Sequence, residues 1–245
     1  MANAASVSKP ESLQYLLVRD DIAARIAAGD LKSGDKLPSE RRLQEEGGVA
    51  RGTVRAGLFQ LEAEGAIYRR DRSGWYVSPP PVDYDPTRWE GFMSYVEAQG
   101  RSPTTKTISA EPIVADPLLA GVFSRPPGAP MFLIRRRRCV DGRAVLVERI
   151  VVDAALAPDL LRFSFDASLT SILKSEYGLS VSRNQVTMQP CALTGYEAEA
   201  LRLKPGLPGL AVQRTSYDAQ GRVVEYDHEH WRHDAVRISV DTRVR

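Results

Sequence analysis

Residues 38–77 have the sequence PSERRLQEEGGVARGTVRAGLFQLEAEGAIYRRDRSGWYV. Ser39 is a favourable helix N-cap, and Glu40 stands in the first turn, where the helix dipole favours an anion. A short helix is therefore expected to about Glu46, where a Gly-Gly pair follows and breaks it. A second helix is expected over 51–64, because apolar side chains recur there on one helical face.

The flanking residues complete a recognisable order of elements. Two short strands are expected at 66–70 and 75–77, on either side of a tight Asp-Arg-Ser-Gly turn. Upstream, residues 13–28 have apolar side chains close to helical spacing, and Gly29 ends that helix. Helix, short helix, turn, helix and hairpin is the order of a winged helix-turn-helix. The sequence therefore predicts a mainly helical DNA-binding domain over residues 11–78.

The candidate DNA contacts follow from the geometry of this motif. Its second helix lies in the major groove with its N-terminal residues at the base edges, while the hairpin tip can enter the adjacent minor groove. Arginine matches the two acceptors of guanine, and threonine suits a phosphate or the thymine methyl group. Isolated arginines are often only part of a solvated basic helix, but the ordered set of elements favours DNA binding. The candidates are Arg41, Arg51, Gly52, Thr53, Arg55, Arg72, Ser73 and Gly74.

Composition sets broad limits on this interpretation. The 245 residues suit two modest domains, and 43% apolar with 26% charged residues is ordinary for a globular protein. The net charge is only +2, and residues 1–78 contain twelve Lys or Arg against eleven Asp or Glu. Affinity for DNA must therefore come from where the charges are placed.

Cysteine usage and hydropathy indicate the compartment. Cys139 and Cys191 have no metal-like spacing, so they are expected to be buried, reduced thiols. The N-terminus lacks the basic and apolar regions of a signal peptide, and no apolar run approaches the ~20 residues of a membrane span. We expect a cytoplasmic protein with no membrane partner and no cofactor.

Prolines 79–81 mark the end of the first domain, because consecutive prolines form an extended, semi-rigid spacer. A linker is expected over 79–88 and a second domain over 89–245. Helices are expected at about 89–99, 117–122, 168–177 and 195–201, and strands at 131–140, 145–152, 181–188, 209–217 and 223–232. Asp141-Gly142 is a strong hairpin turn. Hairpins with interspersed helices predict an α+β domain on an antiparallel sheet.

The first domain resembles the GntR family of bacterial transcription regulators. The matching blocks are Leu37-Pro-Ser-Glu-Arg-Arg-Leu, Gly48-Val-Ala-Arg-Gly-Thr-Val-Arg, Leu61-Glu-Ala-Glu-Gly and the hairpin. Ala50 departs from the family, which usually has a serine N-cap there, a deficit of ~1 kcal/mol. Gly52 removes one possible DNA contact. Gly57 replaces the usual alanine, at a cost of ~1 kcal/mol in helix propensity.

The second domain resembles the UTRA sensor of the HutC branch of that family. The matching residues are Arg136-Arg-Arg-Cys-Val-Asp-Gly, Glu148, Asp166-Ala-Ser-Leu and Tyr217-Asp-Ala-Gln-Gly-Arg-Val-Val-Glu. The resemblance implies a chorismate-lyase-like fold and a pocket for small anionic metabolites, often sugar phosphates. A lyase-like enzyme joined to a DNA-binding module is the rival class, but no nucleophile and base are evident, so we do not expect an enzyme.

Strand periodicity independently indicates an anion site. Arg136 and Arg138 project to one face of their strand, and two inward arginines are costly to bury without an anion. Ser168 lies at an expected helix start, where free N–H groups favour phosphate. Glu148, across the hairpin, could accept from a hydroxyl or an ammonium group. The alternative is a solvent-exposed hairpin held by Arg–Glu pairs.

Further blocks resemble the phosphonate-utilisation regulators of this branch. They include Asp71-Arg-Ser-Gly-Trp-Tyr-Val and Trp231-Arg-His-Asp, and they imply 2-aminoethylphosphonate or a close derivative as effector. Its ammonium group would lie near Glu148 or Glu225. An amino-sugar phosphate or a histidine catabolite is the alternative effector. The candidate effector contacts are Arg136, Arg138, Glu148, Ser168, Glu225 and Trp231.

Two further expectations concern partners and metals. Two recognition helices must meet paired half-sites, so a homodimer on a pseudo-palindromic operator is expected. His228 and His230 share a strand face, and His233 lies close by in the sequence. No carboxylate or cysteine cluster of suitable geometry is evident beside them, so we expect surface or pocket-rim histidines and no metal site.

Overall fold

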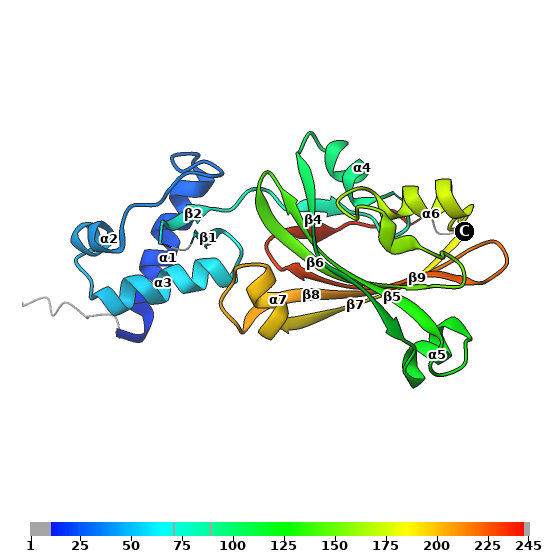
Figure 1. Cartoon of the computed structure of the whole chain (residues 1–245). Helices are drawn as coiled ribbons and strands as arrows, with labels where there is room; N and C mark the ends of the chain where they lie inside the picture. Colours follow the sequence, from blue (N-terminus) through cyan, green and yellow to red (C-terminus); the bar gives the residue numbers. More distant parts are fainter. Residues whose placement is uncertain (1–10, 71, 89, 243–245) are drawn as a thin grey trace, which may run out of the picture. The chain divides into compact units, whose positions relative to one another are not determined.

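The computed structural model describes residues 11–70, 72–88 and 90–242 (Figure 1). The chain divides into two compact units, residues 1–81 and 82–245. The proline run thus ends the first unit, as its backbone preference indicates. No helix among the described residues is both long enough and apolar enough to cross a membrane.

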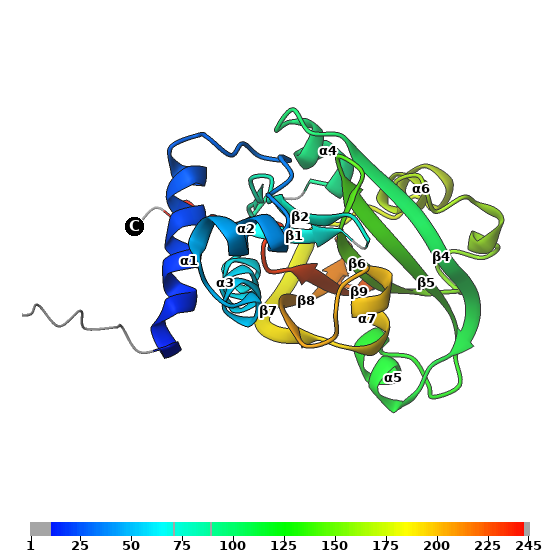
Figure 2. The same cartoon turned by 90° about the vertical axis from the view of Figure 1, so that its left-hand side faces the viewer.

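The first unit has the expected order of elements. They are α1 (Glu11–Ala27), α2 (Glu40–Gly47), α3 (Arg51–Ala63), β1 (Ile67–Arg70) and β2 (Gly74–Val77). The two strands are antiparallel, with Tyr68 opposite Tyr76. Ile22 of α1, Leu58 and Leu61 of α3, and Ile67 of β1 are fully buried in one core. Figure 2 shows α1 alongside α3.

The close approach of α1 and α3 explains Gly57. A Cβ atom on this residue would lie 2.8 Å from the carbonyl oxygen of Tyr15 and 3.0 Å from Cβ of Val18. Because the nearer obstacle is backbone, the two helices would have to separate. The glycine that costs helix propensity therefore permits the packing of these helices.

Gly57→Ala should consequently destabilise the first unit by about 1–3 kcal/mol, since overpacking outweighs the ~1 kcal/mol gained in propensity. Gly52 in the same helix is the matched control: nothing lies within 4 Å of its Cβ position. Gly52→Ala should leave the unit as stable or stabilise it by up to ~1 kcal/mol. Urea unfolding measures both. Equal stability of Gly57→Ala and the wild type would contradict the tight α1–α3 contact.

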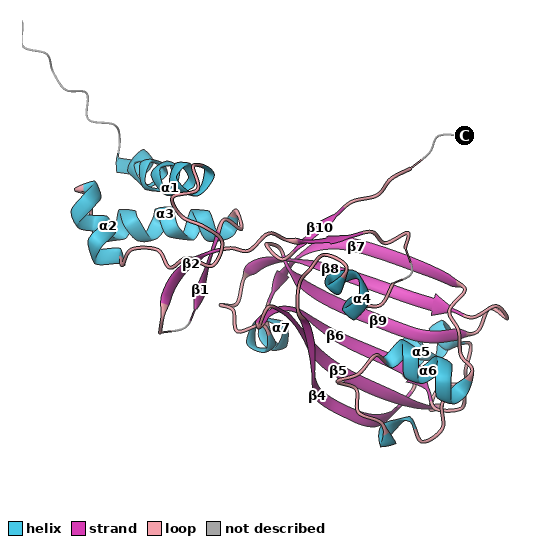
Figure 3. Cartoon of the chain, turned by 90° about the horizontal axis from the view of Figure 1, so that it is seen from above, coloured by secondary structure: helices cyan, strands magenta, loops and turns pink. Residues whose placement is uncertain are grey.

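The second unit is built on a six-stranded antiparallel sheet in the order β4-β5-β6-β9-β8-β7 (Figure 3). The strands are β4 (Pro103–Val114), β5 (Pro130–Val140), β6 (Arg143–Asp153), β7 (Arg183–Leu193), β8 (Leu207–Tyr217) and β9 (Val223–Arg232). A separate parallel pair joins β3 (Val82–Tyr84) to β10 (Val236–Ile238). The helices are α4 (Phe92–Glu97), α5 (Pro117–Phe123), α6 (Leu169–Tyr177), α7 (Gly195–Ala200) and the 3-10 helix η1 (Leu160–Arg162).

The helices cover opposite faces of the sheet. Leu173 of α6 packs with Ile134 and Ile150, whereas Phe123 of α5 packs with Leu133 and other residues of the second face. Figure 1 shows α4 and α6 on one side of the sheet and α5 on the other. Since side chains alternate along a strand, every second residue of β5, β6 and β9 faces α4 and α6.

The Asp141-Gly142 hairpin is confirmed. Both residues have positive φ, at 50° and 76°, as a type I′ turn requires. The turn places β5 and β6 in register with Arg136 opposite Glu148. The antiparallel α+β architecture is also confirmed.

Three strands were not expected. β4 is polar and contains Pro103 and Pro112, which an edge strand tolerates because one side of its backbone needs no partner. Residues 82–84, expected as linker, form β3, so the expected linker 79–88 is wrong over this part. β3 is a strand because β10, far along the chain, pairs with it. The expected helix start at residue 89 lies outside the described residues.

Candidate DNA-binding surface and effector pocket

The start of α3 is exposed and basic. Its N-cap, Ala50, makes no side-chain cap hydrogen bond, as the sequence indicated. Glu40 of α2 lies between two exposed arginines, with Oε2 3.6 Å from Nε of Arg51 and 3.9 Å from Nε of Arg55. Exposed pairs of this kind contribute ~0–1 kcal/mol, so DNA can displace them. Arg41 is 86% exposed beside Glu45.

The hairpin tip combines a tight turn with flanking aromatic residues. Arg72 and Gly74 both have positive φ. The hydroxyl groups of Ser73 and Tyr76 are hydrogen-bonded at 2.6 Å, which fixes one side of the tip. The Arg70 guanidinium stacks on the Tyr76 ring, 4.5 Å from its centroid. Arg72 itself is exposed.

A small cavity of about 130 Å³ lies between the sheet and the helices α4 and α6; we call it the effector pocket. The segment that begins at Glu90 and runs into α4 forms one wall, and the start of α6 forms another. Three arginines and four buried carboxylic acids line it, in addition to the exposed Glu90: Arg136, Arg138, Arg214, Glu148, Glu225, Asp227 and Glu229.

The expected pair of inward arginines is present. Arg136 and Arg138 are only 2% and 7% exposed, and both contact Oε1 of Glu148, Arg138 through Nε at 2.9 Å. Arg138 also donates to Thr105 Oγ1 at 2.8 Å, and its guanidinium lies over the Phe92 ring. One carboxylate thus serves two guanidinium groups. This part of the pocket has an excess of positive charge.

The N-terminus of α6 faces the same cavity. Ser168 is the N-cap and accepts a hydrogen bond from the backbone N–H of Ser171 at 3.3 Å. The pocket lining includes Ser168, Leu169, Thr170 and Ser171. Unsatisfied N–H groups at a helix start attract anions. We call Arg136, Arg138 and this helix start the arginine subsite.

The central strand β9 supplies a row of acidic side chains. Glu225, Asp227 and Glu229 alternate along it, and all three are buried. Glu229 accepts from Arg214 at 2.8 Å and from the Trp231 indole at 2.7 Å. Burial and the neighbouring carboxylates of Glu229, Glu148 and Glu225 raise the pKa of Asp227 well above its usual 3.8. Burial likewise raises the pKa of Glu225.

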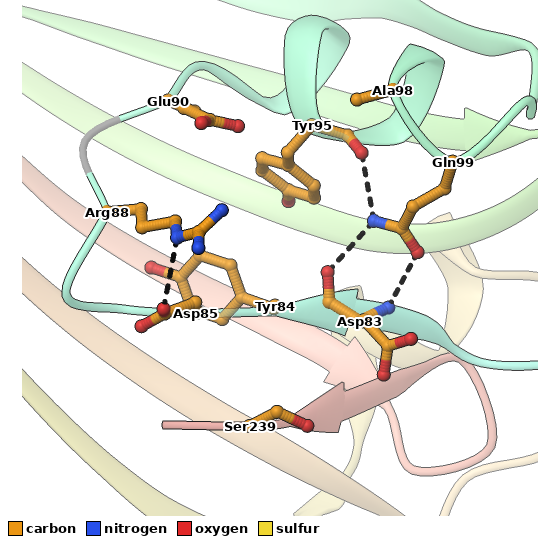
Figure 4. A pocket seen from close by; sticks show the side chains of 9 residues that line it. All are labelled: Asp83, Tyr84, Asp85, Arg88, Glu90, Tyr95, Ala98, Gln99 and Ser239. Carbon is orange, nitrogen blue, oxygen red and sulfur yellow. Dashed lines mark hydrogen bonds and ion pairs between the residues drawn. The ribbon is translucent and has the colours of Figure 1, made fainter. Parts of the chain in front are cut away.

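A second cavity, of about 220 Å³, lies beside the effector pocket and shares Tyr95 and Glu90 with it (Figure 4). The Gln99 side chain joins α4 to β3 there: its amide donates to the carbonyl of Asp83 at 2.9 Å and accepts from the N–H of Asp83 at 2.9 Å. The Tyr84 hydroxyl accepts from Arg214 at 2.6 Å. The residues that follow α4 and Arg214 of β8 are thus both bonded to β3.

Comparison with known proteins identifies the family. Residues 14–77 match the bacterial regulatory proteins of the gntR family, and residues 98–237 match the UTRA domain. The chain belongs to the GntR family. More specifically, it is a HutC-type regulator, with a DNA-binding helix-turn-helix unit and a UTRA ligand-binding unit.

Relatives of this GntR regulator align along most of its length. The HTH-type transcriptional repressor PhnF of Mycolicibacterium smegmatis is 30% identical, covering 94% of this chain and 93% of that protein. The HTH-type transcriptional repressor NagR of Bacillus subtilis is 27% identical, covering 90% of each. The crystal structure of PhnF from Mycobacterium smegmatis matches with a TM-score of 0.67 at 27% identity, over 93% of this chain and all of that one.

The structure changes the expected roles of two residues in the pocket of this GntR regulator. Trp231 is 1% exposed and does not line the effector pocket. It packs against Phe92 and Tyr84, and its indole donates to the pocket residue Glu229. Glu148, expected to accept from an effector hydroxyl or ammonium, pairs through its Oε1 with both arginines.

Arg214, Asp227 and Glu229 were missed as pocket residues. The signal was present in the Glu225-x-Asp227-x-Glu229 alternation on a strand already expected. Arg214 is opposite Asp227 in the sheet register, a pairing that becomes known only when β8 is aligned with β9.

The three histidines lie away from this pocket. His228 and His230 line a cavity of about 640 Å³ on the opposite face of the sheet, with Arg135 and Arg149. His233 is half-buried and its Nδ1 lies 3.1 Å from the carbonyl of Pro208. In the part of the chain that the structure describes, no group of three or more His, Cys, Asp or Glu side chains could hold a metal ion.

Proposed function

We propose that this chain is a repressor that binds operator DNA as a homodimer in the cytoplasm and releases it when a small phosphonate or phosphate enters the effector pocket. The observation that supports this most directly is the arginine subsite, in which two buried arginines share one carboxylate at a helix start. An anionic ligand supplies the missing negative charge. The relatives PhnF and NagR are both named transcriptional repressors, which supports the direction of control.

In the first unit, DNA contact is assigned to the exposed start of α3 and to the hairpin tip. Arg51 and Arg55 reach base edges. Gly52 allows a close approach to the DNA backbone, and Thr53 contacts it. Arg41, on α2, contacts a DNA phosphate. The tip residues Arg72, Ser73 and Gly74 enter the minor groove. The arginines are held by Glu40 only through exposed ion pairs, which DNA phosphates replace.

The size of the effector pocket favours a small ligand. Its 130 Å³ is well below the ~300–1,000 Å³ of ordinary ligand pockets. A molecule with a few non-hydrogen atoms beside its phosphonate group fits better than a hexose phosphate. This supports 2-aminoethylphosphonate, and hence control of phosphonate-utilisation genes, over an amino-sugar phosphate or a histidine catabolite.

Titration calorimetry with 2-aminoethylphosphonate and glucosamine 6-phosphate tests the assignment. We expect binding of the first and much weaker binding of the second. Tighter binding of the sugar phosphate would assign this regulator to a different catabolic system. Conversion of 2-aminoethylphosphonate to a product would show that the pocket is catalytic.

A bonded route leads from the effector pocket to the start of the second unit. Glu229 in the pocket pairs with Arg214, and Arg214 donates to the Tyr84 hydroxyl. Burial raises the pKa of Tyr84 to about 12, so this hydroxyl stays protonated at physiological pH. Tyr84 is the third residue after Pro81, where the proline spacer ends. We propose that effector binding shifts Arg214 and that β3 transmits the shift to the spacer.

Tyr84→Phe should weaken this coupling without removing either binding activity. The ring packing is kept, while one hydrogen bond of about 1 kcal/mol is lost. We expect unchanged operator affinity without effector, and a smaller ratio of affinities with and without it, by roughly 0.5–2 kcal/mol. Tyr177→Phe is the matched control, because it removes a hydroxyl bond to the carbonyl of Pro158 in the same unit but outside the effector pocket. An unchanged ratio in Tyr84→Phe would exclude this route.

A further inference from the structure

Two of the four buried acids in the effector pocket form no ion pair with a described residue. Glu148 is paired with Arg136 and Arg138, and Glu229 with Arg214. Glu225 forms no ion pair with any residue that the structure describes, and the same holds for Asp227 across the described ranges. The ion pairs of the three pocket arginines thus go to Glu148 and Glu229, and none goes to Glu225 or Asp227 within the described residues.

The same two acids also contain buried atoms without hydrogen bonds. Oε1 of Glu225 and Oδ1 of Asp227 are inaccessible to solvent and have no partner among the described residues. The two residues are only 6% and 7% exposed, and both line the cavity. Leaving such groups unpaired is unfavourable, and native proteins rarely retain them without a functional reason.

Charge is thus divided along the pocket. The arginine subsite has an excess of positive charge, and Glu225 and Asp227 on β9 provide acceptors without donors. The two acids lie two residues apart on one strand, so they face the same cavity. A ligand with an anionic end and a donor-rich cationic end complements both parts.

We propose that Glu225 and Asp227 form a subsite for the ammonium group of a zwitterionic effector whose anionic end occupies the arginine subsite. This rests on the proposed function and makes the effector class narrower: a primary amine carrying a phosphonate or phosphate. An ammonium group offers three donors and no acceptor, which suits two carboxylates. A metal ion fits less well, because no cluster of three or more ligating side chains exists among the described residues.

The subsite predicts a pH dependence of stability. A carboxyl group whose pKa is raised on folding stabilises the protein at low pH, and that contribution is lost as pH rises through the raised pKa. Without effector, the free energy of unfolding of the wild type should therefore fall as pH rises above the usual carboxyl range. The fall should be smaller in Asp227→Asn. Charged and titratable groups facing Asp227 are Glu148, Glu225, Glu229, Arg136, Arg214 and Tyr84.

The test compares two probes that differ only in the amine, 2-aminoethylphosphonate and ethylphosphonate. By calorimetry the wild type should bind 2-aminoethylphosphonate about 10- to 100-fold more tightly than ethylphosphonate, because one charge-assisted hydrogen bond contributes about that ratio of affinities. Asp227→Asn should reduce that preference to near unity, with an ethylphosphonate affinity equal to or higher than that of the wild type, because a carboxylate facing Arg136 is removed. Glu225→Gln should also reduce it. The buried Asp153, which pairs with Arg125 away from the pocket, provides the control Asp153→Asn.

Each outcome is decisive. Equal affinities of the two probes for the wild type would overturn the ammonium subsite and leave the phosphonate sensor intact. A preference that persists in both Asp227→Asn and Glu225→Gln would place the ammonium elsewhere. Binding that requires added Mg²⁺ or Ca²⁺ would assign the acids to a cation. Absence of binding by either probe would instead contradict the proposed function. Thermal unfolding shows that each variant is folded.

Discussion

Arg55→Ala should reduce operator affinity by about 30-fold to 20,000-fold. A bidentate arginine–guanine contact contributes about 1–3 kcal/mol, and a homodimer loses it twice. The side chain is 46% exposed and lies 3.9 Å from Glu40, so its removal leaves no buried partner without a bond. Fluorescence anisotropy with an operator selected from random duplex DNA measures the loss.

Arg25→Ala is the control for this variant. Arg25 lies on α1 and pairs weakly with Asp21 at 3.9 Å, so the same charge is removed away from the proposed DNA surface. Its operator affinity should stay close to that of the wild type. Loss of dimers in Arg55→Ala, or operator affinity equal to that of Arg25→Ala, would contradict the role of Arg55.

Arg138→Gln should weaken effector binding by about 30-fold to 5,000-fold and abolish operator release at effector concentrations that saturate the wild type. Losing one partner of a buried charged contact typically weakens binding by about 2–5 kcal/mol. Arg136 still pairs with Glu148, so that carboxylate is not left alone. Operator affinity without effector should be unchanged, since Arg138 lies in the second unit.

Arg143→Gln separates this effect from a general loss of stability. Arg143 is a buried arginine in β6 that pairs with the buried Asp234 outside the effector pocket. Both variants remove a buried guanidinium, so both should lower the unfolding temperature. Only Arg138→Gln should lose the effector response. A response retained by Arg138→Gln, or lost equally in both, would move the anion site elsewhere.

The positions of the arginine-subsite residues could be predicted because they depend on strand alternation, turn type and helix capping, which are local in the sequence. Strand alternation placed Arg136 and Arg138 on one face, and the Asp-Gly turn fixed Glu148 opposite them. Ser168 could be recognised as an N-cap from the residues that follow it. None of these inferences required knowledge of distant pairing.

The acidic half depends on pairing that the sequence does not reveal. β9 is central because it pairs with both β6 and β8, and so its polar run VVEYDHEHWR is buried although its composition is that of an exposed strand. Asp227 consequently faces the pocket, while Trp231 of the same face lies beneath α4 in the core. β3 could not be foreseen for the same reason, since its partner β10 is far along the chain.

The most direct test of the central claim is to titrate 2-aminoethylphosphonate into the complex of the full chain with its labelled operator and follow anisotropy. We predict that the operator is released, by a coupling of about 1–3 kcal/mol, with a midpoint that moves to much higher concentration in Arg138→Gln. Wild-type anisotropy that stays constant while calorimetry shows the effector bound would contradict the account. It would mean that the pocket binds its ligand without controlling DNA binding.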